Sequence, residues 1–248
     1  MLQDLHTHTT YCDGKASPEE MVLSAIEKGL DRIGICTHCY TDFDESYCIP
    51  HEEYGKFQAE VAALKEKYKD KIEVLCGVEQ DVFSDTETDG FDYVIGSCHY
   101  VPADDMLAPI DSLEEVLEYI CSEGYGGDYI AVAESYYKSV AKIVEKTNCD
   151  IIGHFDLITK YNEGGRLFDE KDPRYVAAWK AAADELLKSG KTFEINTGAI
   201  SRGYRTTPYP SNEIFEYISS HGGKFILSSD AHSADTIAYD FEKYGGRL

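Results

Sequence analysis

The stretches Asp4-Leu5-His6-Thr7-His8, near the start of the chain, and Ser229-Asp230-Ala231-His232, near its end, decide how the fold is interpreted. Each directly follows an apolar, strand-like run. Side chains alternate between the two faces of an extended backbone, so the two histidines of the first stretch share a face, as do the Asp and His of the second. Imidazole nitrogens and carboxylate oxygens together suit zinc and similar divalent cations. The two stretches therefore look like halves of one metal site.

Length and composition favour one large domain. The chain has 248 residues, of which 43% are hydrophobic, enough for a sizeable core. We therefore expect a single domain spanning residues 1–248. No apolar run approaches the ~20 residues that a membrane span needs. The N-terminus also lacks the basic and then apolar pattern of a signal peptide, so we expect a cytoplasmic protein without a membrane partner.

The net charge of −23 argues against nucleic acid as a partner, because phosphates would be repelled. The eight cysteines are spread singly, which in a reducing compartment indicates buried thiols rather than disulfides. The C-x-x-C sequence at 36–39 is not followed by a helical pattern of the thioredoxin kind, so we do not expect a redox role. The sequence does not indicate an oligomeric state.

Strand-like and helix-like segments alternate along the chain, which predicts an α/β fold with a parallel sheet covered by helices. One helix start is well marked, with Ser17 as N-cap, Pro18 at the first helical position and Glu20 completing a capping box. The expected strands are 2–5, 33–36, 72–78, 93–98, 151–152, 192–195 and 225–227, and the expected helices are 17–29, 52–68, 113–121, 129–147, 173–189 and 212–220.

Residue types that commonly bind metal ions follow the expected strands, at or just beyond their ends. Six of the eight histidines and two carboxylates lie there: His6, His8, His38, Glu79, His99, His154, Asp230 and His232. In a parallel barrel the carboxyl ends of all strands open on one face, where active sites are built. A single histidine at such a place is commonly an ordinary loop residue. The whole set favours one shared site, from which we exclude His51 and His221.

These residues carry a family resemblance. The motifs His6-x-His8, Thr37-His38, Gly77-Val78-Glu79, Ser97-Cys98-His99, 153–156 and 229–232, with Asp13 after the first, resemble in their order those of the polymerase-and-histidinol-phosphatase (PHP) superfamily. The segments 153–158 and 194–198 resemble the histidinol-phosphatase branch. The resemblance covers nearly the whole chain. It implies a distorted seven-stranded, TIM-like (β/α) barrel of the PHP type that binds two to three divalent metal ions, commonly zinc, iron or manganese.

Carried over position by position, the resemblance implies three metal positions. The first would use His6, His8, Glu79 and Asp230; the second would use Glu79 again, as a bridge, with His99 and His154; the third would use Asp13, His38 and His232. Some relatives carry His where this chain has Asp13. A carboxylate can still bind a metal, so the third position is retained.

The implied activity is that of a metal-dependent phosphomonoesterase, which hydrolyses L-histidinol phosphate to L-histidinol and inorganic phosphate in histidine biosynthesis. Three divalent ions carry six positive charges and three ligand carboxylates return three, so the site would attract a small phosphorylated substrate despite the acidic surface. The leaving alkoxide needs a proton or a metal, and Asp230 or His232 could supply the proton. The sequence does not decide between these two catalytic candidates.

Basic residues near the later strand ends are candidate phosphate partners: Lys160, Arg166, Arg202 and Arg205. We favour Arg202, because it follows the end of the expected strand at 192–195 and because the guanidinium fork matches phosphate oxygens. Glu194 and Asn196 alternate with apolar neighbours on that strand. We expect them to orient ligand imidazoles rather than to react.

Three alternatives remain open. Another PHP phosphoesterase could act on nucleotides, whereas action on DNA ends is disfavoured because basic patches are absent. A metal-dependent amidohydrolase is a more distant alternative, since His-x-His metal sites on barrels recur in that class. A non-catalytic metal-binding or interaction domain would be indicated by degenerate ligand positions, and the sequence has none.

Overall fold

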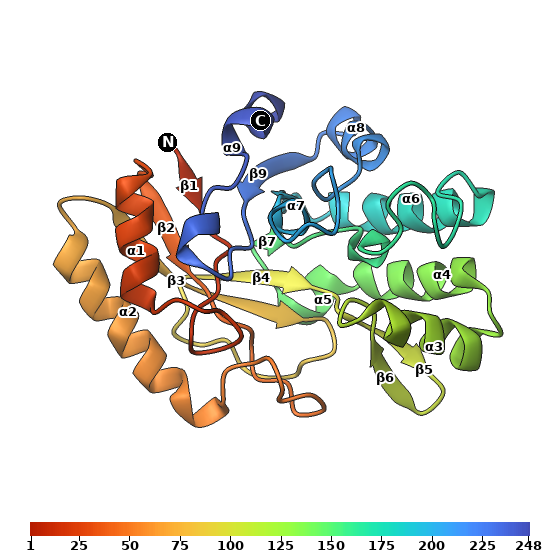
Figure 1. The fold of residues 1–248 in the computed structure, drawn as a ribbon, viewed down its shortest axis with the longest axis horizontal. Helices are drawn as coiled ribbons and strands as arrows, with labels where there is room; N and C mark the ends of the chain where they lie inside the picture. The colour runs from red at the N-terminus through yellow and green to blue at the C-terminus, as the bar shows by residue number, and fades with distance from the viewer.

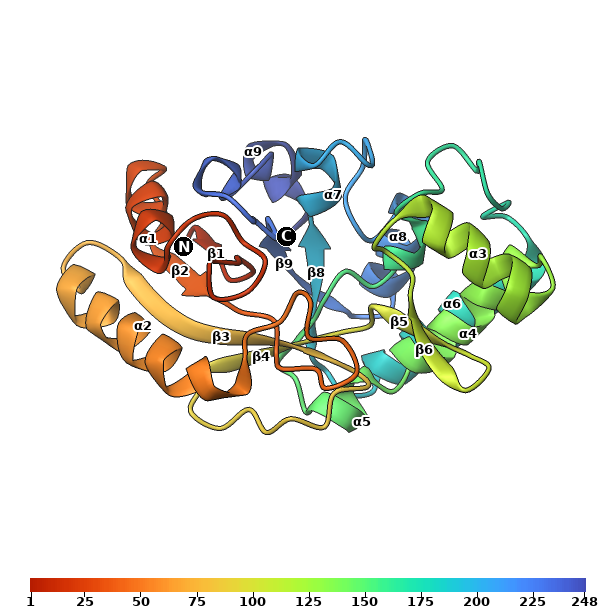
Figure 2. The same cartoon turned by 60° about the horizontal axis from the view of Figure 1, so that its bottom comes forward.

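Seven parallel strands form a curved sheet at the centre of the computed structural model, which describes residues 1–248. Figures 1 and 2 show that the sheet curls into a nearly closed barrel. The strands, in their order around the sheet, are β1 (Gln3–Asp4), β2 (Arg32–Ile35), β3 (Glu73–Asp81), β4 (Tyr93–Ser97), β7 (Ile151–Ile152), β8 (Thr192–Asn196) and β9 (Lys224–Ser228). The predicted distorted seven-stranded barrel is confirmed.

Helices surround the barrel on the outside, with α1 and α2 at one end of Figure 1 and α3, α4 and α6 at the other. Their bounds are α1 Pro18–Glu27, α2 Tyr54–Tyr68, α3 Glu114–Tyr125, α4 Tyr129–Val140, α5 Ile143–Thr147, α6 Pro173–Leu187, α7 Gly198–Ser201, α8 Asn212–Ser220 and α9 Phe241–Tyr244. Four 3-10 helices lie at His51–Glu53, Leu157–Thr159, Ala234–Thr236 and Gly245–Arg247. None of the helices combines the length and the apolar character that crossing a membrane requires.

Local sequence explains how α1 begins and which face it buries. The Ser17 hydroxyl accepts a hydrogen bond from the Glu20 backbone N–H while the Glu20 carboxylate accepts one from the Ser17 N–H, which is the predicted capping box. Met21, Val22 and Ala25 recur at helical spacing and are fully buried against the barrel. The helix is therefore fixed both at its start and along one face.

The barrel closes between its first and last strands without a full ladder. An isolated parallel bridge joins Thr7 to Ala231, just beyond β1 and β9. Its hydrogen bonds run from His8 N–H to the Ala231 carbonyl, at 2.7 Å, and from Ala231 N–H to the His6 carbonyl, at 3.2 Å. The two sequence stretches that suggested a shared site therefore close the barrel themselves.

Three features differ from the expectation. β3 continues to Asp81, so Glu79 lies within a strand rather than at its end, because residues 79–81 pair with Ile95–Ser97 of β4. An antiparallel hairpin of β5 (Tyr100–Ala103) and β6 (Met106–Pro109) follows β4 and was not predicted. The helix expected over 129–147 is divided into α4 and α5.

The second part of that helix, α5, packs directly against β4. Gly96 lies in β4, and a Cβ placed there would lie 2.4 Å from Ile143 Cγ2 and 2.7 Å from Thr147 Oγ1. Gly96 thus permits a close approach of helix and sheet that a side chain would block.

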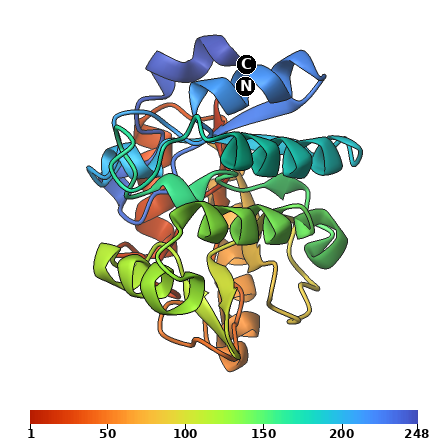
Figure 3. The same ribbon diagram turned by 90° about the vertical axis from the view of Figure 1, so that its right-hand side faces the viewer.

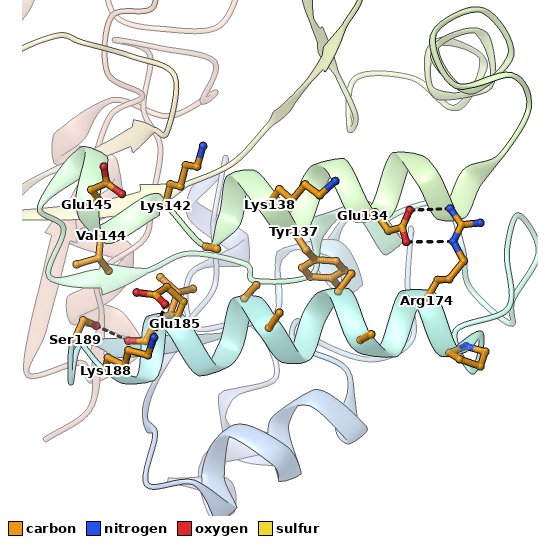
Figure 4. Close-up of a pocket in the computed structure, with 17 residues that line it drawn as sticks. Glu134, Tyr137, Lys138, Lys142, Val144, Glu145, Arg174, Glu185, Lys188 and Ser189 are labelled. Carbon is orange, nitrogen blue, oxygen red and sulfur yellow. Dashed lines mark hydrogen bonds and ion pairs between the residues drawn. The ribbon is translucent and has the colours of Figure 1, made fainter.

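α4 and α6 lie side by side on the outside of the barrel, as Figures 1 and 3 show. A groove of about 1140 Å³ runs along them. Small apolar side chains, among them Ala178 and Ala182, line the groove. Figure 4 shows the Arg174 guanidinium paired with the Glu134 carboxylate near one end. None of the predicted site residues lines this groove.

Replacing Gly96 by Ala should destabilise the protein, because the added methyl group overpacks the α5–β4 contact. We expect a loss of about 1–3 kcal/mol in the free energy of unfolding, measured by urea denaturation. Gly55→Ala in α2 is the matched control, since a Cβ there meets nothing within 4 Å. An equal effect of the two substitutions would contradict the packing argument.

Candidate metal centre

The predicted ligand residues converge around the buried carboxylate of Glu79, at the carboxyl-terminal end of the barrel. A cavity of about 300 Å³ opens beside them. Its wall includes Asp13, His38, Glu79, His99, His154, Asp230 and His232, while His6 and His8 lie fully buried behind it. Residues separated by more than 200 positions in the sequence thus share one site.

The first cluster joins the two terminal stretches. His6 Nε2 lies 3.1 Å from Glu79 Oε2 and 3.7 Å from Asp230 Oδ1, and His8 Nε2 lies 3.4 Å from each of these oxygens. Ligands at about 2.0–2.1 Å from a tetrahedral zinc ion are about 3.3 Å apart. The ligand atoms of His6, His8 and Glu79 all lie within 4.8 Å of one another, the spacing of a coordination shell, and Asp230 places an oxygen near both imidazoles.

Three of these atoms also lack a hydrogen-bond partner. His6 Nε2, His8 Nε2 and Glu79 Oε2 are buried and make no hydrogen bond within the protein. Unsatisfied buried polar atoms are costly, so several of them facing one point call for a ligand. This donor set of two imidazoles and two carboxylates fits a divalent cation.

A second cluster forms on the other oxygen of Glu79. Oε1 lies 2.9 Å from His154 Nε2 and 3.4 Å from His99 Nε2. The two carboxylate oxygens therefore face two different groups of imidazoles. This is the arrangement expected of a bridging ligand.

The third predicted set lies nearer to solvent. The Asp13 carboxylate is 3.6 Å from His38 Nε2 and 3.2 Å from His232 Nε2. The His8 ring lies beside both imidazoles, with centroid distances of 4.2 Å to His38 and 4.4 Å to His232. His38 also places Nδ1 3.0 Å from Glu79 Oε2, so it connects the third set to the first.

Neighbouring cationic groups determine the ionisation of the two ligand carboxyl groups, Glu79 and Asp230. Burial alone would raise the pKa of Glu79, but the surrounding imidazoles of His6 and His38 hold it well below the usual range. Burial likewise opposes ionisation of Asp230, yet Arg202 and His6 keep its pKa well below the ordinary value. Both carboxylates are therefore anions.

The two histidines of the first stretch differ from each other. Burial, together with the neighbouring His38 and His232, lowers the pKa of His8 to about 3, so its imidazole is neutral and ready to coordinate. Burial would also lower the pKa of His6, but Glu194 and Glu79 raise it well above the ordinary value. A cation bound beside His6 would have to displace a proton.

Glu194 has the supporting position that the sequence predicts for it. Its Oε1 lies 2.7 Å from His6 Nδ1, and its Oε2 accepts hydrogen bonds from the His154 backbone N–H and the Asn196 amide, each at 3.1 Å. A carboxylate on the outer nitrogen of a ligand imidazole fixes its tautomer and direction. Glu194 thereby orients parts of both Glu79 clusters.

Two further supporting carboxylates were missed. Asp81 lies 3.1 Å from His99 Nδ1 and accepts a hydrogen bond from the His99 N–H at 2.7 Å, and Asp4 accepts from the Ser229 N–H at 3.1 Å. Both are two residues from a predicted ligand, Asp81 after Glu79 and Asp4 before His6. The two-residue period that links His6 to His8 could have identified them.

Of the four candidate phosphate partners, Arg202 and Lys160 line the cavity. Arg202 Nη2 lies 2.9 Å from Asp230 Oδ2, and its Nη1 donates to the Asp230 carbonyl at 2.7 Å. Lys160 Nζ donates instead to the Asp111 carbonyl. Arg202 is therefore the cation nearest to the ligand clusters.

The expectation for Arg205 needs correction. It does not line the cavity; it is buried, donates to the Thr159 and Thr207 hydroxyls and lies over the Tyr209 ring. These contacts hold it as a structural residue. Arg166 pairs with Glu114 at 2.6 Å, also away from the cavity.

Comparisons with known proteins agree with this geometry. A Deinococcus radiodurans protein named probable histidinol-phosphatase is 29% identical over 259 residues, covering 97% of this chain and 90% of that protein. A Listeria monocytogenes structure assigned as a histidinol phosphatase has a TM-score of 0.85 at 21% identity, covering 98% of this chain and 99% of the other.

A Lactococcus lactis histidinol phosphate phosphatase, solved with zinc, L-histidinol and phosphate, has a TM-score of 0.70 at 20% identity and covers 99% of this chain and 92% of its own. The PHP domain family matches residues 4–198, which include β2 to β8 in full and the last residue of β1. With this match over most of its length, the chain belongs to the PHP domain family.

Proposed function

We propose that this protein is a metal-dependent phosphomonoesterase that hydrolyses L-histidinol phosphate to L-histidinol and inorganic phosphate. The observation that carries the proposal is the convergence of the unpartnered atoms His6 Nε2, His8 Nε2 and Glu79 Oε2 beside a cavity that contains Arg202. Three similar proteins named as histidinol phosphatases support the choice of substrate, and one of them holds zinc, L-histidinol and phosphate.

Two to three divalent ions, zinc, iron or manganese, complete the proposed site. The residues that would hold them are His6, His8, Glu79 and Asp230 for the first, Glu79, His99 and His154 for the second, and Asp13, His38 and His232 for the third. Bound divalent ions supply Lewis acidity and lower the pKa of coordinated water.

The remaining roles follow from the charges of the protein groups. Arg202 would bind the phosphate oxygens of the substrate, because it is the guanidinium nearest to the clusters and its side chain is partly accessible from the cavity. Lys160 is a weaker second contact, since its ammonium group is already bonded to Asp111.

The two catalytic candidates differ in charge. Asp230 is ion-paired with Arg202 as an anion and cannot supply a proton. Burial would lower the pKa of His232, but the Asp13 carboxylate raises it. We assign the proton for the leaving alcohol to His232 in the form that holds two ions, where this imidazole does not coordinate.

We place this activity in the cytoplasm, with a small phosphorylated molecule and not a nucleic acid as partner. All eight cysteines are free thiols, seven of them buried, which suits a reducing compartment. The net charge of −23 disfavours a nucleic acid.

The first test is phosphate release from L-histidinol phosphate by the purified protein. We expect activity that is lost on chelation and restored by manganese or zinc, with elemental analysis giving two to three ions per chain. Metal-loaded protein that hydrolyses nucleotides but not histidinol phosphate would refute the substrate. Hydrolysis of amides alone would indicate an amidohydrolase.

Replacing Glu79 by Gln should reduce phosphate release by at least about 1,000-fold, because both Glu79 clusters lose the shared anion. Glu73→Gln is the matched control, since Glu73 is an exposed residue of the same strand. Circular dichroism should show both variants folded. Wild-type turnover in a folded Glu79→Gln protein would contradict the bridging role.

Replacing Glu194 by Gln should weaken metal binding about 10- to 100-fold, because the neutral amide no longer holds His6 Nδ1 by charge. Metal affinity is measured by competition with a chromophoric chelator. If activity at saturating metal also stays low, the ligand geometry is disturbed; unchanged affinity would show that Glu194 does not support the centre.

A further inference from the structure

We propose that the Asp111 carboxylate binds an ammonium group on the alcohol part of the substrate. The protein would then select phosphate monoesters of amino alcohols over those of neutral alcohols. This inference rests on the proposed phosphomonoesterase function and names a residue that reads the leaving group. It follows from the distribution of charge in the cavity beside the metal centre.

The cavity contains groups that suit an anion and other groups that suit a cation. Its inner end carries the ligand clusters and the Arg202 guanidinium, which suit a phosphate dianion. Its wall also contains two carboxylates outside the predicted ligand set, Asp44 and Asp111. Carboxylates in a low-dielectric pocket repel a phosphate and attract a cation, so a carboxylate with free acceptor positions there suits a cationic part of the substrate.

These two carboxylates differ in how many hydrogen bonds they already accept. Asp44 is already occupied: Oδ1 accepts from the Ser46 N–H and hydroxyl, and Oδ2 accepts from the Tyr100 hydroxyl. The Asp111 carboxylate makes no hydrogen bond within the protein, and its nearest cation, Lys160 Nζ, is 3.6 Å from Oδ2. A carboxylate has about four acceptor positions, so Asp111 retains capacity for an ammonium donor.

Lys160 partly offsets the negative charge of Asp111 from 3.6 Å, a distance too long for a hydrogen bond to the carboxylate. The ammonium donates to the Asp111 backbone carbonyl and lies 4.6 Å from the centre of the Tyr204 ring. The Tyr161 hydroxyl donates to the same carbonyl at 3.0 Å. The backbone is thus held by other groups, and the side chain, 26% exposed, is left facing the cavity.

The β5–β6 hairpin explains why Asp111 lies at this place. The hairpin leaves the barrel directly after His99 and returns at Ile110, whose N–H donates to the His99 carbonyl at 2.9 Å. Asp111 is the next residue. The hairpin therefore returns the chain to the rim of the metal centre, beside a predicted ligand, and Figure 2 shows it projecting from that side of the barrel.

The experiment compares phosphate esters that differ by one amine. The metal-loaded full chain is assayed with L-histidinol phosphate, phosphoethanolamine, ethyl phosphate and p-nitrophenyl phosphate. In Asp111→Asn we expect kcat/KM for the two ammonium esters to fall about 10- to 100-fold, mainly through KM, because a charge-assisted hydrogen bond is lost. The two neutral esters should stay within about twofold, since their alcohols carry no ammonium group.

Asp105→Asn is the matched control, because it removes the same charge at the exposed tip of the same hairpin. It should leave all four values unchanged. Since Lys160 and Tyr161 bond the backbone of residue 111, the Asn variant should keep its melting temperature, and calorimetry should show weaker L-histidinol binding.

The outcomes separate the two proposals. Equal changes for ammonium and neutral esters, or none, would overturn the role of Asp111. Selectivity that depends on Asp111 with no preference for histidinol phosphate would overturn the proposed substrate alone. A protein that hydrolyses none of the four esters would overturn both.

Discussion

The parallel bridge between Thr7 and Ala231 is the contact on which the site depends. β1 has only two residues, and β1 and β9 share no continuous ladder, so the bridge and the Asp4 carboxylate hold the two edges of the sheet together. Asp4 accepts hydrogen bonds from Ser229 and, at 2.9 Å, from the Ala238 N–H. The bridge lies directly between the ligand pairs His6/His8 and Asp230/His232, so the same contacts that join the edges of the sheet place these pairs side by side. Closing the barrel and assembling the first cluster are therefore one event.

The convergence has an electrostatic cost that a cation would offset. Glu79, Glu194 and Asp230 are buried anions; imidazoles compensate the first two, and Arg202 together with His6 compensates Asp230. Asp230 is also held in the left-handed region, with φ of 51°, where few non-glycine residues are stable. Strain and buried charge of this kind persist at functional sites. A divalent cation would replace protons among these groups, so its affinity should increase as protons are removed.

The sequence predicted most of the barrel and the convergence of the ligand residues, because both depend on patterns within a few residues. Short apolar runs that alternate with helical patterns along the chain identified the seven strands, and the two-residue period of a strand paired His6 with His8. The β5–β6 hairpin was missed, since each of its strands is only four residues long and contains a proline, Pro102 or Pro109, which disfavours a strand assignment. Arg205 was misplaced because sequence position near a strand end does not reveal which way a long side chain turns. Tertiary contacts with Thr159 and Tyr209 decide that.

Asp13 stands where some members of the PHP superfamily carry a histidine, and it lies in the most accessible part of the centre. The first two clusters share the buried Glu79 carboxylate, whereas the third depends on Asp13, whose side chain is 36% exposed. A carboxylate at this position returns one more negative charge than a neutral imidazole would, and a softer nitrogen ligand is lost. An ion held there would be bound by fewer buried groups and by a more mobile side chain. The third position should therefore exchange its ion most readily, and the two clusters on Glu79 should set the minimum metal content of the active protein.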